Sequence, residues 1–294
     1  DLCLGNGHSC ALMAGGEVHC WGVNSRGQLG YDDRVSRGAT PETMATSVAL
    51  DLGQPAVSIG CGALFTCALL ADASLKCWGD SAQGQLGQGR EFPLGDDPGE
   101  MAALPAVDLG VHGRIQQMSV GSRHVCALFE DHTLKCFGQD SFGALGLAPL
   151  GDRGDAPGEM GANLPAVPLN EAIEVSQVVA GDGTTCVLAN GGAVLCWGQS
   201  GRYGTVGLER PDPVIRFAGL EHSPMDYVGP PPLIALSLSR HHVCAQSATR
   251  TMHCWGWNED GQLGTGDQRT LGRGQGDLAD LGTAIPLGRG CGLC

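Results

Sequence analysis

Long apolar runs, aromatic side chains and basic residues are all scarce in this sequence. No apolar run approaches the roughly 20 residues that a membrane-spanning helix needs, and aromatic residues make up only 5% of the chain. Lysine and arginine number 17 against 31 aspartates and glutamates, which gives a formal net charge of -14. Nucleic-acid backbones and anionic membrane surfaces repel such a protein. We therefore expect neither a nucleic-acid partner nor insertion into a membrane.

The motifs of common catalytic sites are missing as well. The chain has no nucleophile elbow, phosphate-binding loop or His-Glu-x-x-His zinc motif, and no pair of catalytic carboxylates stands out. Its glycine-rich stretches follow strand-like segments without opening a helix, so they do not match a dinucleotide site. We therefore expect a protein that is not an enzyme and needs no cofactor, with calcium as the one exception considered below.

Glycine and cysteine are abundant instead. The 48 glycines lack the every-third-residue spacing of collagen, and a hydrophobic content of 42% is too high for a disordered chain. Glycine at intervals among apolar residues is typical of short strands joined by tight turns. The 14 cysteines indicate an oxidising compartment, unless they bind a metal.

One cysteine pattern occurs five times. Two cysteines separated by nine residues are followed by Trp-Gly, with Phe137 once replacing tryptophan, and then by Gly-Gln-Leu-Gly or a variant of it. The period is 57, 59, 60 and 58 residues, which indicates an array or a β-propeller. A single domain over residues 1–294 would then hold units at about 1–53, 54–110, 111–170, 171–229 and 230–288, with a cysteine-containing tail at 289–294.

Each unit contains four strand-like segments. In the second unit these are residues 57–59, 67–70, 75–78 and 107–109, and the last has counterparts at 167–169 and 285–287, where prolines mark an outer edge. A three-residue loop whose last residue is left-handed suits the hairpin between the second and third strands, and explains Gly16 and Gly192. Four short strands per repeat are the composition of a propeller blade. The predicted fold is an all-β propeller of five four-stranded blades.

The paired cysteines lie symmetrically about each hairpin turn. Residues directly opposite each other on antiparallel strands have Cβ atoms about 4.5–5.5 Å apart, close to disulfide reach. Zinc ligands usually lie two to four residues apart and converge in fours, which this spacing does not provide. We therefore predict five hairpin disulfides, each worth about 2–3 kcal/mol. They join Cys10 to Cys20, Cys67 to Cys77, Cys126 to Cys136, Cys186 to Cys196 and Cys244 to Cys254.

Four cysteines remain, namely Cys3, Cys61, Cys291 and Cys294. The last two have the spacing of a redox motif, but they lie in a glycine-rich tail and not at the start of a helix. Two further disulfides are the simpler reading, and three pairings exist. We favour a bond from Cys3 to Cys291 or Cys294, which would close a five-bladed ring with adjacent termini.

The repeat resembles a known one. Gly-x-x-His-x-Cys-Ala-Leu, a turn, and Val-x-Cys-Trp-Gly-x-Asn-x-x-Gly-Gln-Leu-Gly are similar to the repeat of the regulator of chromosome condensation family, over nearly the whole chain. Members of that family usually have seven blades, so a five-bladed protein and part of a longer ring both remain open. The paired cysteines depart from the family's usual content and resemble a secreted bacterial branch. This resemblance implies an extracytoplasmic location: secreted, periplasmic or on the cell surface.

Two residue types recur at fixed repeat positions. We expect the histidines to make a structural hydrogen bond within each blade, and the tryptophans to pack between blades, where each buries a large area. The residues are His8, His124 and His242, and Trp21, Trp78, Trp197 and Trp255.

Two long connections carry Gly-Asp-x-Pro-Gly-Glu-Met, within residues 88–106 and 147–166, and residues 37–44 are a degenerate copy. Long ordered loops often carry function. We expect their acids to give one negative surface that attracts a basic protein or binds calcium, and to be replaceable without loss of the fold. A repeated turn with acids for solubility is the alternative reading. The acids are Asp96, Asp97, Glu100, Asp152, Asp155 and Glu159.

These observations together predict a non-catalytic binding or scaffold module outside the cytoplasm, which recognises a protein partner through loops on the propeller face or rim. The alternatives are a calcium-ordered adhesion or inhibitor protein and a carbohydrate-binding module. A glycan would contact loop aromatics, for which the candidates are Tyr31, Phe92, Tyr203, Tyr227 and Trp257.

Overall fold

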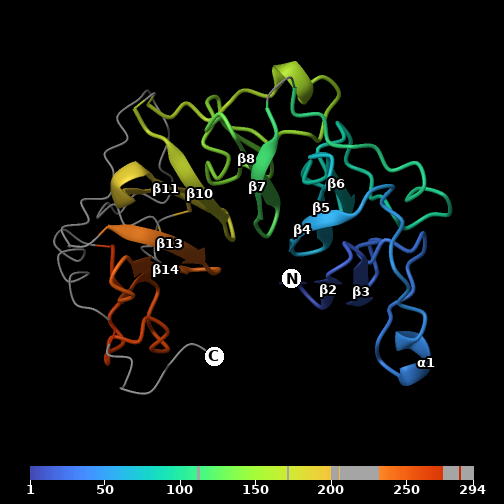
Figure 1. Ribbon diagram of the computed structural model, residues 1–294, viewed down its shortest axis with the longest axis horizontal. Helices are drawn as coiled ribbons and strands as arrows, with labels where there is room; N and C mark the ends of the chain where they lie inside the picture. The colour runs from blue at the N-terminus through green and yellow to red at the C-terminus, as the bar shows by residue number, and fades with distance from the viewer. Residues whose placement is uncertain (111–112, 171, 200–204, 206–231, 274–284, 286–294) are drawn as a thin grey trace. The chain divides into compact units, whose positions relative to one another are not determined.

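Five three-stranded antiparallel sheets make up the part of the chain that the structure describes, a computed structural model covering residues 1–110, 113–170, 172–199, 205, 232–273 and 285 (Figure 1). Each sheet consists of strands that are consecutive in the sequence. The strands are β1 (Leu2–Leu4), β2 (His8–Leu12) and β3 (Val18–Gly22); β4 (Ala56–Cys61), β5 (Phe65–Leu70) and β6 (Leu75–Gly79); β7 (Ile115–Val120), β8 (His124–Phe129) and β9 (Leu134–Gly138); β10 (Val175–Ala180), β11 (Thr184–Ala189) and β12 (Val194–Gly198); and β13 (Leu233–Leu238), β14 (His242–Ser247) and β15 (Met252–Gly256).

The helices among these residues are single turns: α1 (Pro41–Met44), η1 (Gly161–Asn163) and η2 (Asn190–Gly192). Within the described ranges, none is long and apolar enough to span a membrane. The chain divides into two compact units. Unit 1 comprises residues 1–141 and 149–167 and holds the first three sheets, whereas unit 2 comprises residues 142–148 and 168–294 and holds the last two.

The hairpin register is the predicted one in all five sheets. Cys10 lies opposite Cys20 and Leu12 opposite Val18, and every later pair repeats this arrangement. All five hairpin disulfides are formed, with a Cα–Cα distance of 4.1 Å in each. The prediction from turn symmetry is therefore confirmed.

The hairpin turns share a left-handed residue at one repeat position. Gly16 and Gly192 have φ angles of 86° and 83°, as the sequence predicted. The same position holds Ala73, His132 and Arg250, with φ angles of 68°, 65° and 65°. A side chain at such an angle is strained by roughly 1–2 kcal/mol, so three of the five turns form at a cost that glycine would avoid.

The predicted fourth strand is wrong for the described residues. Val107 donates one backbone hydrogen bond to the carbonyl of Leu75, and Val167 donates one to that of Leu134. A single bond does not make a ladder, and Pro168, directly after Val167, has no N–H with which to continue one. In four sheets, the last residue of the third strand instead forms one isolated bridge with the chain that follows it. The bridges join Gly22 with Arg37, Gly79 with Leu94, Gly138 with Arg153, and Gly256 with Leu271.

The bond predicted from Cys3 to the tail is also wrong. Cys3 is joined to Cys61, with a Cα–Cα distance of 5.3 Å. The two cysteines lie on β1 and β4, which contact each other as the first strands of neighbouring sheets in unit 1. The disulfide therefore joins two successive sheets. Cys291 and Cys294 lie outside the described residues.

Successive sheets are joined by one recurring contact. In unit 1, the carbonyl of Gln28 in the first Gly-Gln-Leu-Gly turn accepts hydrogen bonds from the Thr66 hydroxyl (2.9 Å) and the Trp78 indole (3.1 Å) of the second sheet. In unit 2, Thr185 and Trp197 donate to the carbonyl of Ala144 at 2.7 and 2.9 Å. The prediction that the repeated tryptophans pack between blades is confirmed for Trp78, Trp197 and Trp255. Trp21 differs, because it is only half-buried.

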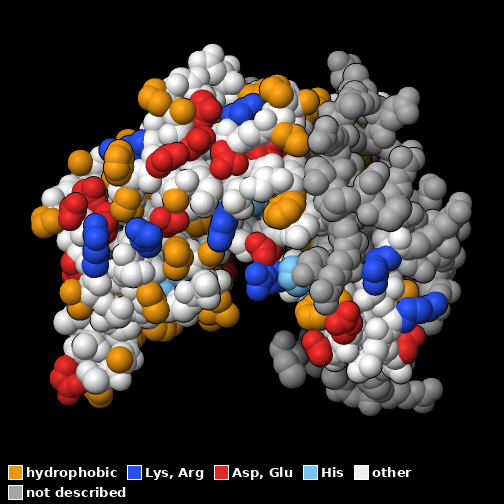
Figure 2. Space-filling view, turned by 180° about the vertical axis from the view of Figure 1, so that it is seen from behind, with side chains coloured by type: hydrophobic (Ala, Val, Ile, Leu, Met, Phe, Trp, Pro, Cys, Tyr) orange, Lys and Arg blue, Asp and Glu red, His pale blue; other side chains and the backbone are white. Residues whose placement is uncertain are grey.

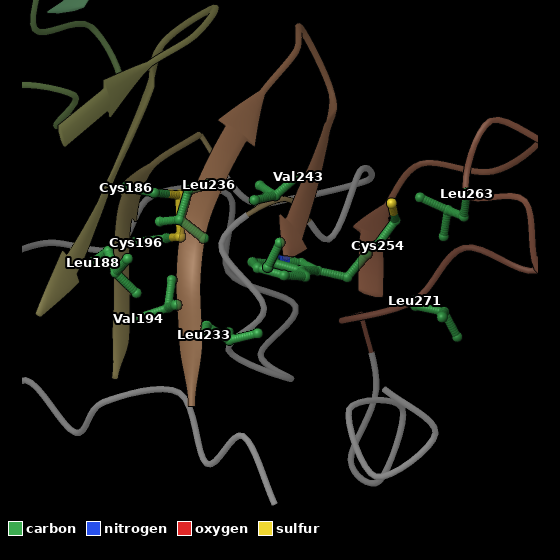
Figure 3. Close-up of a cluster of buried hydrophobic side chains, with 12 residues drawn as sticks. Cys186, Leu188, Val194, Cys196, Leu233, Leu236, Val243, Cys254, Leu263 and Leu271 are labelled. Atoms are coloured by element: carbon green, nitrogen blue, oxygen red, sulfur yellow. A yellow bond between two sulfur atoms is a disulfide. The ribbon is translucent and has the colours of Figure 1, made fainter. Parts of the chain in front are cut away.

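The apolar core of unit 2 continues across its two sheets. Figure 3 shows Leu236 of β13 beside the Cys186–Cys196 disulfide, and Trp255 and Leu263 belong to the same buried cluster. Burying large apolar side chains between sheets stabilises the repeat array by about 25 cal/mol per Å² of apolar surface. Stability therefore depends on each sheet having a neighbour, as expected of a repeat protein.

Candidate protein-binding loops

Glu100 organises the loop at residues 95–101, which we call the first acidic loop. Its Oε2 accepts hydrogen bonds from the backbone N–H groups of Gly95 (2.8 Å), Asp96 (3.1 Å) and Asp97 (3.1 Å). A carboxylate that satisfies three amides in its own turn fixes the backbone of that turn. Glu100 is therefore a structural residue of the loop.

The second acidic loop, residues 154–160, repeats this arrangement. Glu159 Oε2 accepts from the N–H groups of Gly154 (2.9 Å) and Ala156 (3.1 Å). In the degenerate copy, the Thr43 hydroxyl takes the same role by accepting from Gly38 (3.2 Å) and from Thr40 (3.0 Å). The repeated acid is thus used to close a repeated turn.

Each acidic loop rests on the Gly-Gln-Leu-Gly turn of the preceding repeat. A Cβ added at Gly27 would lie 2.5 Å from the backbone nitrogen of Asp96, and one at Gly84 would lie 2.5 Å from that of Asp155. Side chains add to the first of these contacts, because Arg34 donates to the buried Asp96 carboxylate at 2.6 and 3.0 Å. The acidic loops therefore join one repeat to the next.

The remaining acids differ in exposure. Asp97 is exposed, whereas Asp152 is half-buried and accepts from the backbone N–H of Asp140 at 2.7 Å. Burial raises the pKa of Asp155, and the adjacent Glu159 carboxylate raises it further. The structure thus places three of the six acids on the first acidic loop, two on the second, and Asp152 at the end of the presenting loop before it. Four of the six, namely Asp96, Glu100, Asp152 and Glu159, accept hydrogen bonds from the protein.

Among the described acids, Asp96, Asp97 and Glu100 have carboxylate oxygens close enough for a shared cation, within 4.8 Å of one another. Calcium takes six to eight oxygen ligands. Here Arg34 already neutralises Asp96, and Glu100 is already bonded to three amides. The donor set does not fit a resident calcium ion.

A second set of loops, which the sequence pattern did not reveal, lies just before the outer-edge bridges. We call residues 31–36, 88–93 and 149–152 the presenting loops. Each carries one exposed apolar side chain: Val35 is 59% exposed, Phe92 74% and Leu150 41%. Val35 and Phe92 both stand two residues before the bridging residue, so they occupy the same repeat position. Successive sheets of unit 1 therefore offer apolar side chains at matching places.

A buried polar residue anchors each presenting loop at its base, two residues after the bridging glycine. Asn24 donates to the carbonyl of Asp33 at 2.7 Å, and Ser81 donates to that of Arg90 at 2.8 Å. Asp140 accepts from the N–H of Gly151 at 3.1 Å. Asn24 and Ser81 are completely buried. The asparagine of the Trp-Gly-x-Asn motif was the signal in the sequence that could have located these anchors.

The first presenting loop is braced further by Asp33. Its carboxylate accepts from the backbone N–H of Val35 at 2.9 Å and from the Arg37 guanidinium at 2.8 and 3.0 Å, and this pairing holds its pKa below the usual value. Arg37 also lies over the Tyr31 ring, 4.2 Å from the ring centre. These contacts fix the loop before any partner binds, with the Val35 side chain exposed to solvent.

The second presenting loop borders a shallow depression of about 470 Å³. Gln88 and Gly89 line one side of it, and Pro157, Gly158 and Met160 of the second acidic loop line the other. Figure 2 shows hydrophobic and charged side chains interspersed over one face of the described surface, without segregation into large single-type patches.

The candidate sugar-binding aromatics serve different roles. The Tyr31 hydroxyl is bonded to Cys20, Ser47 and Val48, and Trp257 packs edge-on against His241 with ring centres 5.8 Å apart. Tyr203 and Tyr227 lie outside the described residues. Phe92 remains as an exposed ring on a presenting loop.

His8 has the structural role that we expected, but its bond leaves the blade. Its Nε2 lies 3.1 Å from the Thr66 hydroxyl of the next sheet, so the predicted bond within the blade is wrong for this residue. Burial lowers the pKa of His8 to about 4. Phe65 occupies the same repeat position in the second sheet and is equally buried.

The chain is similar to known proteins in sequence and in structure. A model of the regulator of chromosome condensation (RCC1) repeat matches residues 15–69, and a second model of this repeat matches residues 1–28, 56–85, 115–144 and 175–205. The Arabidopsis thaliana ultraviolet-B receptor UVR8 is 31% identical over 90% of this chain, and the probable human E3 ubiquitin-protein ligase HERC6 is 30% identical over 69% of it. The chain spans 55% and 18% of the lengths of these relatives.

Solved structures agree on the fold. Yeast RCC1 (Prp20), determined bound to Kap60, matches with a TM-score of 0.70 at 20% identity, covering 97% of this chain and 60% of the yeast chain. Human WBSCR16 matches with a TM-score of 0.69 at 20% identity, covering 92% of this chain and 65% of the human chain. With its five repeated sheets and recurring Trp-Gly and Gly-Gln-Leu-Gly elements, the chain belongs to the regulator of chromosome condensation repeat family, whose fold is β-propeller-like.

Proposed function

We propose that this protein is a non-catalytic module that binds a protein partner through the presenting loops. The observation that carries the proposal is an exposed apolar side chain on the presenting loop of each of three successive sheets. Val35 and Phe92 occupy one repeat position, and Leu150 stands one residue earlier in the third loop. Exposed apolar side chains on rigid loops contribute most where a partner covers them together. The buried anchors below them reduce the ordering cost of binding.

Two buried titratable residues with shifted pKa values have structural roles, which fits a module without catalysis. The buried His8 is bonded to Thr66 between two sheets, and the buried Lys135 donates to the carbonyl of Leu109 at 2.7 Å. Both residues have lowered pKa values because they are buried. Each of these shifts follows from packing between repeats, so neither calls for a reactive site.

The nature of the partner follows from charge. A net charge of -14 favours a basic protein, and such attraction should weaken as salt is added. One relative in structure, yeast RCC1 (Prp20), was determined bound to Kap60, and its binding to Gsp1p and histones has been described. These are partners of the yeast protein, and they support protein recognition as the mode of action here.

The location that we propose is extracytoplasmic, with the chain in a secreted, cysteine-rich bacterial branch of the family. Its support is the disulfide in every one of the five sheets, since disulfides persist in oxidising compartments and are rare in the cytosol. Thiol alkylation of the protein in its native host, before lysis, tests this: unreactive cysteines in an exported fraction are expected, and reduced cysteines in the cytosol would contradict it.

The test of the binding surface uses a triple variant, Val35→Ser, Phe92→Ser and Leu150→Ser, as bait against the native secreted fraction. Its matched control is Val57→Ser with Ile234→Ser, which removes equally exposed apolar side chains from the first strands of two sheets. We expect the triple variant to retain the fold and to bind the partner at least about tenfold more weakly, since three apolar contacts are lost. Equal capture by wild type and triple variant would overturn the assignment.

A further inference from the structure

Two junctions between repeats in unit 1 are built alike. In each, a Gly-Gln-Leu-Gly turn and the two residues after it lie against the following acidic loop. The first junction joins residues 27–32 to residues 95–101, and the second joins residues 84–89 to residues 154–160. The methyl carbon of Met101 lies 3.1 Å from a Cβ placed at Gly30, and that of Met160 lies 3.1 Å from a Cβ placed at Gly87. The two junctions can therefore be compared residue by residue.

The first junction holds a carboxylate of the chain itself. Asp32 Oδ2 accepts a hydrogen bond from the backbone N–H of Gly99 at 3.0 Å, and its Oδ1 accepts one from that of Met101 at 2.8 Å. Hydrogen bonds to an ionised acceptor are roughly twice as strong as neutral ones. One aspartate of the earlier repeat thus satisfies two backbone donors of the acidic loop that follows.

The second junction lacks this carboxylate. Gly89 stands in the place of Asp32, with a φ angle of 64° against 55° for the aspartate. The N–H groups of Gly158 and Met160 correspond to the two donors of the first junction, but among the described residues neither has a hydrogen-bond partner. Gly89, Gly158 and Met160 all line the depression of about 470 Å³. Met160 is half-buried, whereas its counterpart Met101 is buried. The second junction is therefore open where the first is filled.

From this comparison we propose that the depression at the second junction binds a carboxylate supplied from outside the chain. The two oxygens of this ligand accept from the N–H groups of Gly158 and Met160, as the Asp32 carboxylate does at the first junction. Backbone N–H groups that line a concavity without an acceptor favour an anion. The depression is larger than a carboxylate group, so it also admits the group that carries the carboxylate. The site does not rest on the proposed function, because it needs neither Phe92 nor the other exposed apolar side chains.

One acid, Asp108, also lines the depression, and its charge opposes an anion. The first junction has an acid at the same repeat position, Asp51, since the residue before each acid donates a backbone hydrogen bond to the same place in its sheet. Both carboxylates accept from their own turns, Asp51 from the N–H of Gly53 at 3.0 Å and Asp108 from that of Gly110 at 2.9 Å. The Asp32 carboxylate is bound although Asp51 is present, so Asp108 does not prevent the second junction from binding a carboxylate.

The test follows the backbone amides by ¹H–¹⁵N NMR while sodium acetate is added at constant ionic strength. We expect the signals of Gly158 and Met160 to shift and to saturate in the millimolar range. Those of Gly99 and Met101 should stay in place, because Asp32 already occupies their site. Acetamide, which has a similar shape but no charge, should shift none of the four, and sodium sulfate is the control for general anion binding. Equal shifts with acetate and sulfate, or none with acetate, would overturn the proposal.

The variant Gly89→Asp gives the second junction a carboxylate of its own. It should weaken acetate binding at Gly158 and Met160 at least about tenfold, because the site is then filled from within the chain. A Cβ at residue 89 would lie 3.1 Å from the Ala156 carbonyl oxygen, so the loop must yield slightly to admit it, and dispersed NMR signals verify the fold. Undiminished acetate binding by the folded variant would contradict the proposal.

The reciprocal variant Asp32→Gly needs no additional room and opens the first junction. The amides of Gly99 and Met101 should then respond to acetate as those of the second junction do in the wild type. In each variant, the junction that is left unchanged is the matched control. A folded Asp32→Gly protein in which acetate shifts neither amide would show that the paired N–H groups do not bind an external carboxylate.

Two further probes distinguish the sources of the carboxylate. N-acetyl-aspartate methylamide presents it as the side chain of a peptide, and acetate presents it as a free acid. Tighter binding of the aspartate derivative assigns the site to an acidic side chain of another protein, whereas equal binding assigns it to a small organic acid, and either result supports the site. The corresponding asparagine derivative should bind at least about tenfold more weakly than the aspartate derivative. Equal binding of these two derivatives would overturn the proposal.

Discussion

The acidic loops and the presenting loops follow each other in the chain but direct their side chains differently. In the first acidic loop, the Glu100 carboxylate accepts hydrogen bonds from three backbone amides, and the Asp96 carboxylate accepts one from Arg34. In the presenting loop before it, Phe92 is held out to solvent. The recurring acids Glu100 and Glu159 close the turns of their own loops, whereas the apolar side chains of the presenting loops are exposed to solvent.

The largest stability effect that we expect from a recurring position is at His8. Because its folded pKa is lowered to about 4 from 6.5, the unfolded chain takes up this proton first as pH falls. The stability that the neutral His8 contributes is therefore fully present above pH 6.5. On acidification towards pH 4 it is lost, and the free energy of unfolding falls by roughly 3 kcal/mol. His8→Phe, which copies Phe65, should remove this loss, as measured by urea unfolding at neutral and acidic pH.

The control for His8 is the exposed turn residue His132, changed to asparagine, which tolerates a left-handed backbone. This variant should keep the pH dependence of the wild type. If His8→Phe and the wild type lose stability equally on acidification, the buried His8 is not the group that responds.

Glu100 should give the next largest effect. Glu100→Ala leaves three backbone N–H groups without their acceptor, and we expect the free energy of unfolding to fall by about 2 kcal/mol. Asp97→Ala, in the same loop but exposed, should change it by less than about 0.5 kcal/mol. Equal effects in a thermal or urea melt would show that the acidic loop is not held as described. This prediction replaces the expectation that all six acids can be substituted without effect on the fold.

Ala73 should give the smallest effect, in the opposite direction. Its φ of 68° is strained for an alanine, so Ala73→Gly should raise the free energy of unfolding by up to about 1 kcal/mol. Ala71→Gly, two residues earlier in the same turn, should not raise it. A decrease for Ala73→Gly in differential scanning calorimetry would contradict the turn geometry.

Local sequence rules were sufficient for the hairpins. The symmetry of the cysteines about each turn fixed the register and five disulfides, because both depend only on residues within ten positions of each other. The Cys3–Cys61 bond could not be chosen in this way, since it depends on how two sheets pack. The same holds for His8, whose partner Thr66 is 58 residues away.

The candidate site was harder to predict for a related reason. Asp96 and Glu100 were binding candidates because they are charged. The sequence does not distinguish a carboxylate that accepts backbone hydrogen bonds from one that is free to bind a partner. Val35 and Phe92 have ordinary apolar side chains, and only their exposure on anchored loops marks them. Exposure is a property of packing between repeats, so the sequence pattern did not reveal it.

Hydrogen exchange of the protein with and without its captured partner tests the central claim most directly. We expect the amides of residues 31–37, 88–94 and 149–153 to gain protection on binding, with little change in the acidic loops beyond their existing hydrogen bonds. The triple variant at Val35, Phe92 and Leu150 should show no gain at the same partner concentration. Protection confined to residues 95–101 and 154–160 would contradict the account and return the binding surface to the acidic loops.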